Sequence, residues 1–244
     1  MSSSTSDKTG SRRGARRPAQ RSGRSSALAR RRRIAPAVWI GAAVVAGLVV
    51  LAVIFNANQA PVQTAAGASG TDPRYPYVVG EPGVGATAPG FELPSTGGGT
   101  VALDDYQGQS VLLYFQEGLM CQPCWDQLRD VEQRWDDFAA LGVDSIVSVT
   151  GDPLDALGQK VEIEGLETPL LSDRDLAVSR SYDANRYGMM GGSHNGHSFV
   201  LVGPDGEIRW RADYGGPPEY TMYLPVDTLL ADLEAGTATE GTGA

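Results

Sequence analysis

Residues 111–128 read VLLYFQEGLMCQPCWDQL and contain the only two cysteines of the chain, Cys121 and Cys124. The apolar run 111–115 predicts a buried strand, and apolar residues recur at helical spacing from Trp125 to Phe138. The pair is therefore expected at the first turn of a helix, within disulfide reach. A helix N-terminus carries unpaired N–H groups and a partial positive charge, which favour the reactive thiolate. This arrangement indicates a redox pair or part of a metal site.

Two structural roles for the pair fit the sequence less well. A disulfide between Cys121 and Cys124 closes a ring of about four residues, which stabilises a fold by only about 2 kcal/mol. A structural zinc site needs four ligands. It would require both cysteines and both histidines, His194 and His197, which are only three positions apart. We therefore expect the pair to react or to bind a metal rather than to stabilise the fold.

Charge is distributed unevenly along the chain of 244 residues. Residues 1–35 contain eleven Lys and Arg residues and one acidic residue, whereas the remainder contains nine basic and 28 acidic residues, a net charge of −19. The acidic remainder argues against a nucleic-acid partner. The basic residues stop directly before an apolar segment, so we interpret them as a membrane-topology signal.

The apolar segment 36–55 has twenty residues and no charge. As a helix it would span about 30 Å, the thickness of the hydrocarbon core of a bilayer. Four arginines, residues 30–33, precede it. The positive-inside rule therefore predicts a single-pass protein of the cell membrane, with the N-terminus in the cytoplasm and the C-terminal part outside. A cleaved signal peptide is the alternative. Either way, the cysteines are expected in an extracytoplasmic compartment, where a disulfide persists.

Composition predicts five regions. Residues 1–35 are rich in Ser, Arg and Gly and are expected to be a disordered basic arm in the cytoplasm, followed by the transmembrane helix 36–55. Residues 56–82 are rich in Ala, Gly, Pro, Gln and Thr and are expected to be a flexible extracytoplasmic linker. Residues 83–235 contain the periodic segments of one folded domain, and residues 236–244 are expected to be a disordered tail.

Periodicity and turn residues predict the elements of this domain. They are a hairpin of strands 91–94 and 100–103, a strand 111–116, a helix that ends at Gly142, a strand 143–149, helices 153–163 and 173–182, a hairpin of strands 198–202 and 207–211, and a helix 226–233. A strand, a helix and a second strand in this order imply a parallel pair. The order predicts a three-layer α/β sandwich.

This layout, with Cys-x-x-Cys at the first junction between strand and helix, resembles the thioredoxin superfamily. It is most similar to the redoxin branch that contains AhpC/TSA peroxiredoxins and TlpA-like membrane-anchored thiol oxidoreductases. The residues that carry the resemblance are 85–93, 103–108, Cys121 and Cys124, 147–152, 169–173 and 199–208. The resemblance implies a thioredoxin-like α/β/α sandwich with an N-terminal β-hairpin extension. It also implies thiol–disulfide exchange with proteins of the cell envelope, without a cofactor.

In such an enzyme Cys121 would be the nucleophile, because the N-terminal cysteine of the pair is usually more exposed, and Cys124 would be the resolving thiol. Glu117 lies four residues before Cys121 and could move protons for the pair, although a solvated acid at a strand end is the simpler interpretation. His197 could tune the cysteines by its charge, or it could only cap the strand. These four residues form the predicted catalytic set.

Departures from the family patterns concern two alternative activities, because they argue against a thiol peroxidase and suggest a metal site. A thiol peroxidase of the peroxiredoxin type requires a Thr three residues before its reactive cysteine, where this chain has Gly118, and an Arg near the last hairpin, where no Arg closely precedes Phe199. Thioredoxin-like proteins usually carry a cis-proline before the penultimate strand pair. In this chain residues 192–199 contain no proline, and the pair His197-Ser198 stands there instead.

That His-Ser pair resembles Sco-type copper chaperones, which bind copper with two cysteines and one histidine. The implied metal ligands are Cys121, Cys124 and His197, and two thiolates with an imidazole suit copper. The two-residue spacer between the cysteines departs from the three-residue spacer of that family. A further hypothesis, of a different class, is a redoxin scaffold that only binds a partner.

Overall fold

The computed structural model describes residues 45, 47, 49 and 70–238. The predicted basic arm, most of the predicted transmembrane helix and linker, and residues 239–244 of the predicted tail lie outside the described residues. Within the part of the chain that is described, no helix is long and apolar enough to cross a membrane.

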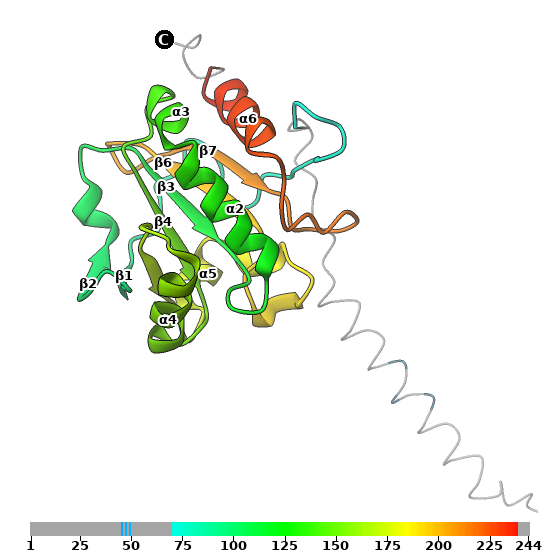
Figure 1. The fold of residues 1–244 in the computed structure, drawn as a ribbon. Helices are drawn as coiled ribbons and strands as arrows, with labels where there is room; N and C mark the ends of the chain where they lie inside the picture. Colours follow the sequence, from blue (N-terminus) through cyan, green and yellow to red (C-terminus); the bar gives the residue numbers. More distant parts are fainter. Residues whose placement is uncertain (1–44, 46, 48, 50–69, 239–244) are drawn as a thin grey trace, which may run out of the picture. The chain divides into compact units, whose positions relative to one another are not determined.

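A five-stranded sheet forms the centre of the domain, with the strand order β5-β4-β3-β6-β7 (Figure 1). Strands β3, β4 and β5 are parallel, while β6 is antiparallel to β3 and to β7. All five residues of β3 are buried, as expected for an apolar strand with both faces covered. The bounds of the strands are Val111–Phe115 (β3), Ser145–Thr150 (β4), Leu170–Ser172 (β5), Ser198–Val202 (β6) and Ile208–Asp213 (β7).

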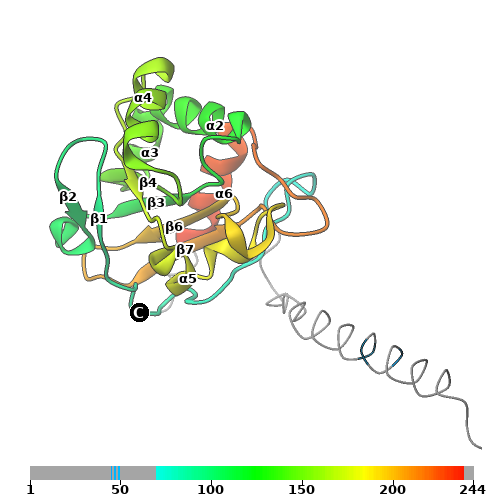
Figure 2. The same ribbon diagram turned by 90° about the horizontal axis from the view of Figure 1, so that it is seen from below.

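Four helices pack on one face of the sheet, and a fifth helix with the N-terminal hairpin covers the other face (Figure 2). The first face carries α2 (Gln122–Gln133), α3 (Trp135–Ala140), α4 (Leu154–Glu164) and α6 (Val226–Ala238). The second face carries α5 (Ala177–Ser181) and the hairpin of β1 (Glu92–Pro94) and β2 (Thr100–Ala102). Three short 3₁₀ helices complete the domain: η1 (Leu103–Tyr106), η2 (Ala184–Arg186) and η3 (Gly191–Ser193).

The predicted elements are confirmed with four main differences. The helix expected over residues 173–182 is shorter and is limited to α5, Ala177–Ser181. The helix expected to continue to Gly142 is divided near Arg134 into α2 and α3. A third parallel strand, β5, follows α4 although its three residues gave no periodic signal. The last helix continues to Ala238, into residues that were expected to belong to the tail.

The described part of the expected linker, residues 70–82, contacts the domain. Val78 and Asp213 exchange two backbone hydrogen bonds, with N···O distances of 3.1 and 2.9 Å. The aromatic rings of Tyr75 and Tyr77 pack against the core on the helical face. A single antiparallel bridge therefore joins this segment to the edge strand β7.

Candidate active site

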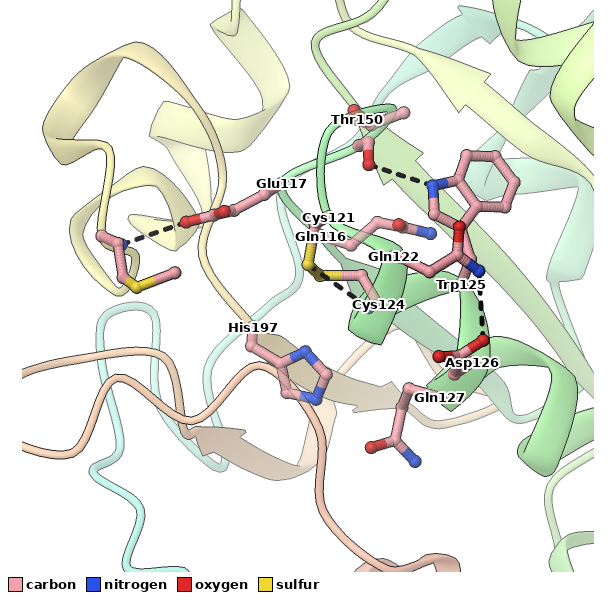
Figure 3. Close-up of a disulfide and its surroundings, with 12 residues drawn as sticks. Gln116, Glu117, Cys121, Gln122, Cys124, Trp125, Asp126, Gln127, Thr150 and His197 are labelled. Atoms are coloured by element: carbon pink, nitrogen blue, oxygen red, sulfur yellow. Dashed lines mark hydrogen bonds between the residues drawn. A yellow bond between two sulfur atoms is a disulfide. The ribbon is translucent and has the colours of Figure 1, made fainter.

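Cys121 and Cys124 form a disulfide at the start of α2, with their Cα atoms 5.3 Å apart (Figure 3). Cys121 is the N-cap of the helix, and its sulfur accepts a hydrogen bond from the backbone N–H of Cys124 at 3.3 Å. The side chain of Cys121 is 5% exposed, whereas Cys124 is fully buried. An incoming sulfur therefore reaches Cys121 first, and the same helix N-terminus stabilises a thiolate there.

The loop before the pair depends on a glycine. Gly118 has a φ of +95°, and a Cβ at this position would lie 1.8 Å from a carboxylate oxygen of Asp152. That same oxygen accepts hydrogen bonds from the backbone N–H of Leu119 at 2.7 Å and from the hydroxyl of Thr150 at 3.0 Å. The threonine that peroxiredoxins have at this position would therefore collide with Asp152.

The carbonyl of Gly118 also organises the first turn of α2. It accepts a hydrogen bond from the backbone N–H of Cys121 at 3.0 Å. It accepts a second from the indole N–H of Trp125, also at 3.0 Å, and the Trp125 side chain is fully buried. The loop and the disulfide therefore form one hydrogen-bonded unit between β3 and α2.

His197 lies beside the disulfide, immediately before β6 (Figure 3). Its Nδ1 is 3.0 Å from the hydroxyl of Tyr114, and the same hydroxyl is 3.3 Å from the carbonyl oxygen of Cys124. When the hydroxyl donates to Cys124, Nδ1 is the donor to Tyr114, and Nε2 is an unprotonated acceptor. Nε2 is buried and has no hydrogen-bond partner among the described residues. One tyrosine thus links the histidine to the backbone of the buried cysteine.

The environment of His197 keeps the imidazole neutral. The ring is fully buried and contacts the rings of Tyr114, Phe199 and Tyr214. This burial lowers the pKa of His197 from 6.5 to about 3, because the protonated ring would lose its hydration. At neutral pH the side chain therefore adds no positive charge beside the sulfurs, and the predicted tuning of the cysteines by a histidine charge finds no support here.

Glu117 is also close to the pair along the chain, but its side chain points towards the loop that precedes β6 (Figure 3). One carboxylate oxygen accepts a hydrogen bond from the backbone N–H of Met189 at 3.1 Å. The residue is buried rather than solvated. Glu117 therefore connects the end of β3 to residues 187–197, and its predicted role in proton transfer stays a prediction.

Two residues that the sequence analysis missed complete the site. Tyr114 was expected only as part of a buried strand, because an uninterrupted apolar run does not show which side chains share a face. Asp152 was noted only within a family pattern. Its function in holding the loop depends on a contact between the ends of β3 and β4, which lie together because these strands are parallel.

The residues proposed as copper ligands are only partly available in this state. The sulfurs of Cys121 and Cys124 are bonded to each other, and Nδ1 of His197 is paired with Tyr114. Among residues 70–238, no group of three or more His, Cys, Asp and Glu side chains is arranged to hold a metal ion. Copper binding by the reduced pair stays a prediction.

The sequence of the chain matches a known protein family. The AhpC/TSA family profile matches residues 84–211. A putative peroxiredoxin of Mycobacterium tuberculosis is 34% identical over 129 residues, which cover 51% of this chain and 80% of that protein. The thiol-disulfide oxidoreductase ResA of Bacillus subtilis is 29% identical over 124 residues, which cover 51% of this chain and 64% of that protein.

Solved structures show the same fold. The 2-Cys peroxiredoxin of Plasmodium vivax, in its reduced form, superimposes with a TM-score of 0.53 at 23% identity, covering 66% of this chain and 84% of that one. The domain is therefore a thioredoxin-like α/β fold with a β-hairpin before it, as predicted. Together with the match over more than half of the sequence, this shows that the chain belongs to the AhpC/TSA family of redoxins.

Proposed function

We propose that the chain is a membrane-anchored thiol–disulfide oxidoreductase that exchanges electrons with partner proteins outside the cytoplasm. The observation that carries this proposal is the asymmetric pair at the start of α2, in which Cys121 keeps 5% of its surface exposed and Cys124 is fully buried. A helix N-terminus stabilises the thiolate of a nucleophilic cysteine, but it does not stabilise a disulfide that has only a structural role. The similarity to ResA, a thiol-disulfide oxidoreductase, supports the same reaction class.

The reaction uses the two cysteines in turn. In the reduced enzyme, the Cys121 thiolate attacks a partner disulfide, a mixed disulfide forms, and the first partner sulfur leaves as a thiolate that takes up a proton. The thiol of Cys124 then loses its proton and attacks the Cys121 sulfur, which releases the second partner thiol and closes the disulfide seen in this structure. Two electrons pass to the partner in each cycle. The same steps in reverse oxidise a partner dithiol.

The proposed location depends on the sequence outside the described residues. The uncharged segment 36–55 follows the arginines 30–33, so the anchor would place the redoxin domain on the far side of the cell membrane. The partners would then be thiols and disulfides of envelope proteins, where oxidising conditions preserve disulfides. A cysteine-labelling reagent that cannot cross membranes tests this topology in intact cells. Labelling of reduced Cys121 supports it, and protection of Cys121 until the cells are lysed contradicts it.

Trapping of partners tests the exchange reaction itself. In a Cys124→Ser chain, Cys121 can attack a partner disulfide but cannot be resolved, so mixed disulfides should accumulate and should dissociate when dithiothreitol is added. The Cys121→Ser chain is the matched control and should trap nothing. Equal trapping by both variants, or by neither, would contradict the proposed roles of the two cysteines.

A thiol peroxidase is the second candidate, because peroxiredoxins occur among the relatives at 34% identity. Here the Cys121 thiolate would attack hydrogen peroxide, with one proton taken up, to give a sulfenic acid and water. Cys124 would then displace a second water and form the disulfide. Against this activity, Gly118 has no room for a threonine, and Arg211 is buried in an ion pair with Asp213.

Consumption of peroxide with dithiothreitol as the reductant separates the two candidates. The oxidoreductase proposal expects the wild-type chain to consume peroxide no faster than the Cys121→Ser chain does, while it still reduces insulin. Rapid consumption that requires Cys121 would favour the peroxidase.

A further inference from the structure

Three of the four described methionines are exposed, although methionine is usually a buried residue. The exposed fractions are 93% for Met120, 58% for Met189 and 57% for Met190. We call these three residues the methionine rim. The fourth methionine, Met222, is buried in the core. Exposed apolar side chains of this size need an explanation when several of them gather in one region.

The methionine rim adjoins the disulfide. Met120 directly precedes Cys121 in the sequence. Met189 is held close to the end of β3 by its backbone hydrogen bond to Glu117, which lies four residues before Cys121, and Met190 is the next residue along the chain. Because Cys121 is only 5% exposed and its neighbour Met120 is 93% exposed, we expect a polypeptide whose sulfur reaches Cys121 to contact Met120.

The two segments that carry the methionine rim contain no charged residue, although Asp126, Lys160 and Glu164 contact Gln122 on the other side of the pair. Residues 118–125 and residues 187–197 contain no Asp, Glu, Lys or Arg. The chain outside residues 1–35 nevertheless carries 28 acidic residues. A depletion of charge together with an enrichment of methionine is typical of the centre of a protein–protein interface. Methionine side chains are flexible and polarizable, so they adapt to apolar surfaces of different shapes.

We propose that the methionine rim is the docking surface for the substrate, and that the substrate is an uncharged, apolar, unfolded polypeptide segment that carries the reacting cysteine. This inference rests on the proposed oxidoreductase function and names its substrate class. The lack of charge and the adaptable side chains favour many unfolded sequences over one folded partner with a fixed surface. A small thiol or a peroxide needs no such surface, because it reaches Cys121 without covering the rim.

The test compares two thiols that reduce the Cys121–Cys124 disulfide of the full-length chain. Dithiothreitol is the small thiol, and an unstructured, uncharged peptide with two cysteines among Leu, Val and Ala residues is the polypeptide thiol. Phospholipid nanodiscs hold the chain, so that no free detergent covers the methionines. Each methionine of the rim is replaced by glutamine singly, and Met120→Gln, Met189→Gln and Met190→Gln are then combined. Glutamine keeps the length and flexibility of the side chain and removes its apolar character.

The matched control is Val84→Gln. Val84 is an exposed apolar residue, and the next residue, Gly85, is hydrogen-bonded to Ile208. Ile208 pairs with Val202, whereas the end of β3 near the cysteines pairs with Ser198, so Val84 lies at the opposite end of the sheet. Its replacement should change neither the rate of reduction by dithiothreitol nor the rate of reduction by the polypeptide thiol.

The proposal expects the second-order rate constant of the triple variant with the apolar peptide to be about tenfold lower than that of the wild type, as for the loss of an interface hot spot. Its rate with dithiothreitol should equal that of the wild type. Unchanged rates with both thiols would overturn the proposal, and so would equal losses with both, because the methionines would then act on the disulfide itself. Self-association of the wild type that the triple variant loses would assign the rim to a second copy of the chain. A wild-type chain that exchanges with no protein thiol would contradict the proposed function itself.

Discussion

Replacement of the buried histidine by phenylalanine should make the protein less sensitive to acid. His197 is fully buried, and burial holds its pKa at about 3 in the folded chain, against 6.5 for an exposed histidine. Below pH 6.5 the unfolded chain therefore binds a proton that the folded chain does not bind. Acidification then stabilises the unfolded state, so the contribution of this residue to folding is lost as the pH falls from 6.5 towards 3.

The size of the effect follows from the two pKa values. Each pKa unit corresponds to about 1.4 kcal/mol, so at pH 5 the wild-type chain should lose about 2 kcal/mol of unfolding free energy through His197. The His197→Phe variant keeps the ring contacts with Tyr114, Phe199 and Tyr214 and has no proton to bind. The other titrating groups act equally on both chains and cancel in the difference.

Urea unfolding of both chains at pH values from 8 to 5 measures this difference directly. The free-energy difference between wild type and His197→Phe should be constant from pH 8 to pH 7, and it should change by about 1.4 kcal/mol per pH unit below pH 6. Parallel curves over the whole range would refute the reasoning. They would show that His197 has an ordinary pKa in the folded chain and is hydrated or paired with an acid.

Two further predictions concern stability. Gly118→Ala should lower the unfolding free energy by about 3 kcal/mol, as measured in urea titrations. The added Cβ strains the backbone and displaces the Asp152 carboxylate from two hydrogen bonds. A loss below about 1 kcal/mol would contradict the geometry of this loop. Asp232→Ala should cost about 2 kcal/mol, because it leaves the buried Tyr214 hydroxyl unpaired. The control is Asp227→Ala on the same helix, which removes a carboxylate that is 80% exposed and should cost less than about 1 kcal/mol. Equal losses of unfolding free energy in the two Asp variants would argue against the Asp232 contact.

The parts of the fold that depend on local pattern could be predicted from the sequence. The apolar run before the cysteines is the central strand β3, and the pair begins α2 as expected. The strand β5 was missed because three residues are too few to show a period, and it forms only because β4 offers a parallel edge. The break near Arg134 was missed because the apolar spacing continues across it.

The site was predictable where its residues are adjacent in the sequence, and unpredictable where strands bring them together. Cys121 and Cys124 were assigned as a pair from their spacing alone. The contact of Tyr114 with His197 spans 83 positions and results from the antiparallel register of β3 and β6. Glu117 was considered either as a proton carrier for the cysteines or as a solvated acid, and its contact with the backbone of Met189 is one that no local pattern encodes.

The most direct test of the redox function is an equilibrium titration of the Cys121–Cys124 pair against dithiothreitol and glutathione buffers. The reduced fraction is read by thiol labelling of the full-length chain. We expect one two-electron transition, in which the ratio of reduced to oxidised pair changes tenfold for each change of about 30 mV in the potential of the buffer. The midpoint should lie above about −300 mV, in the range of pairs that exchange with other proteins. A pair that stays oxidised below about −300 mV, as structural disulfides do, would contradict the account.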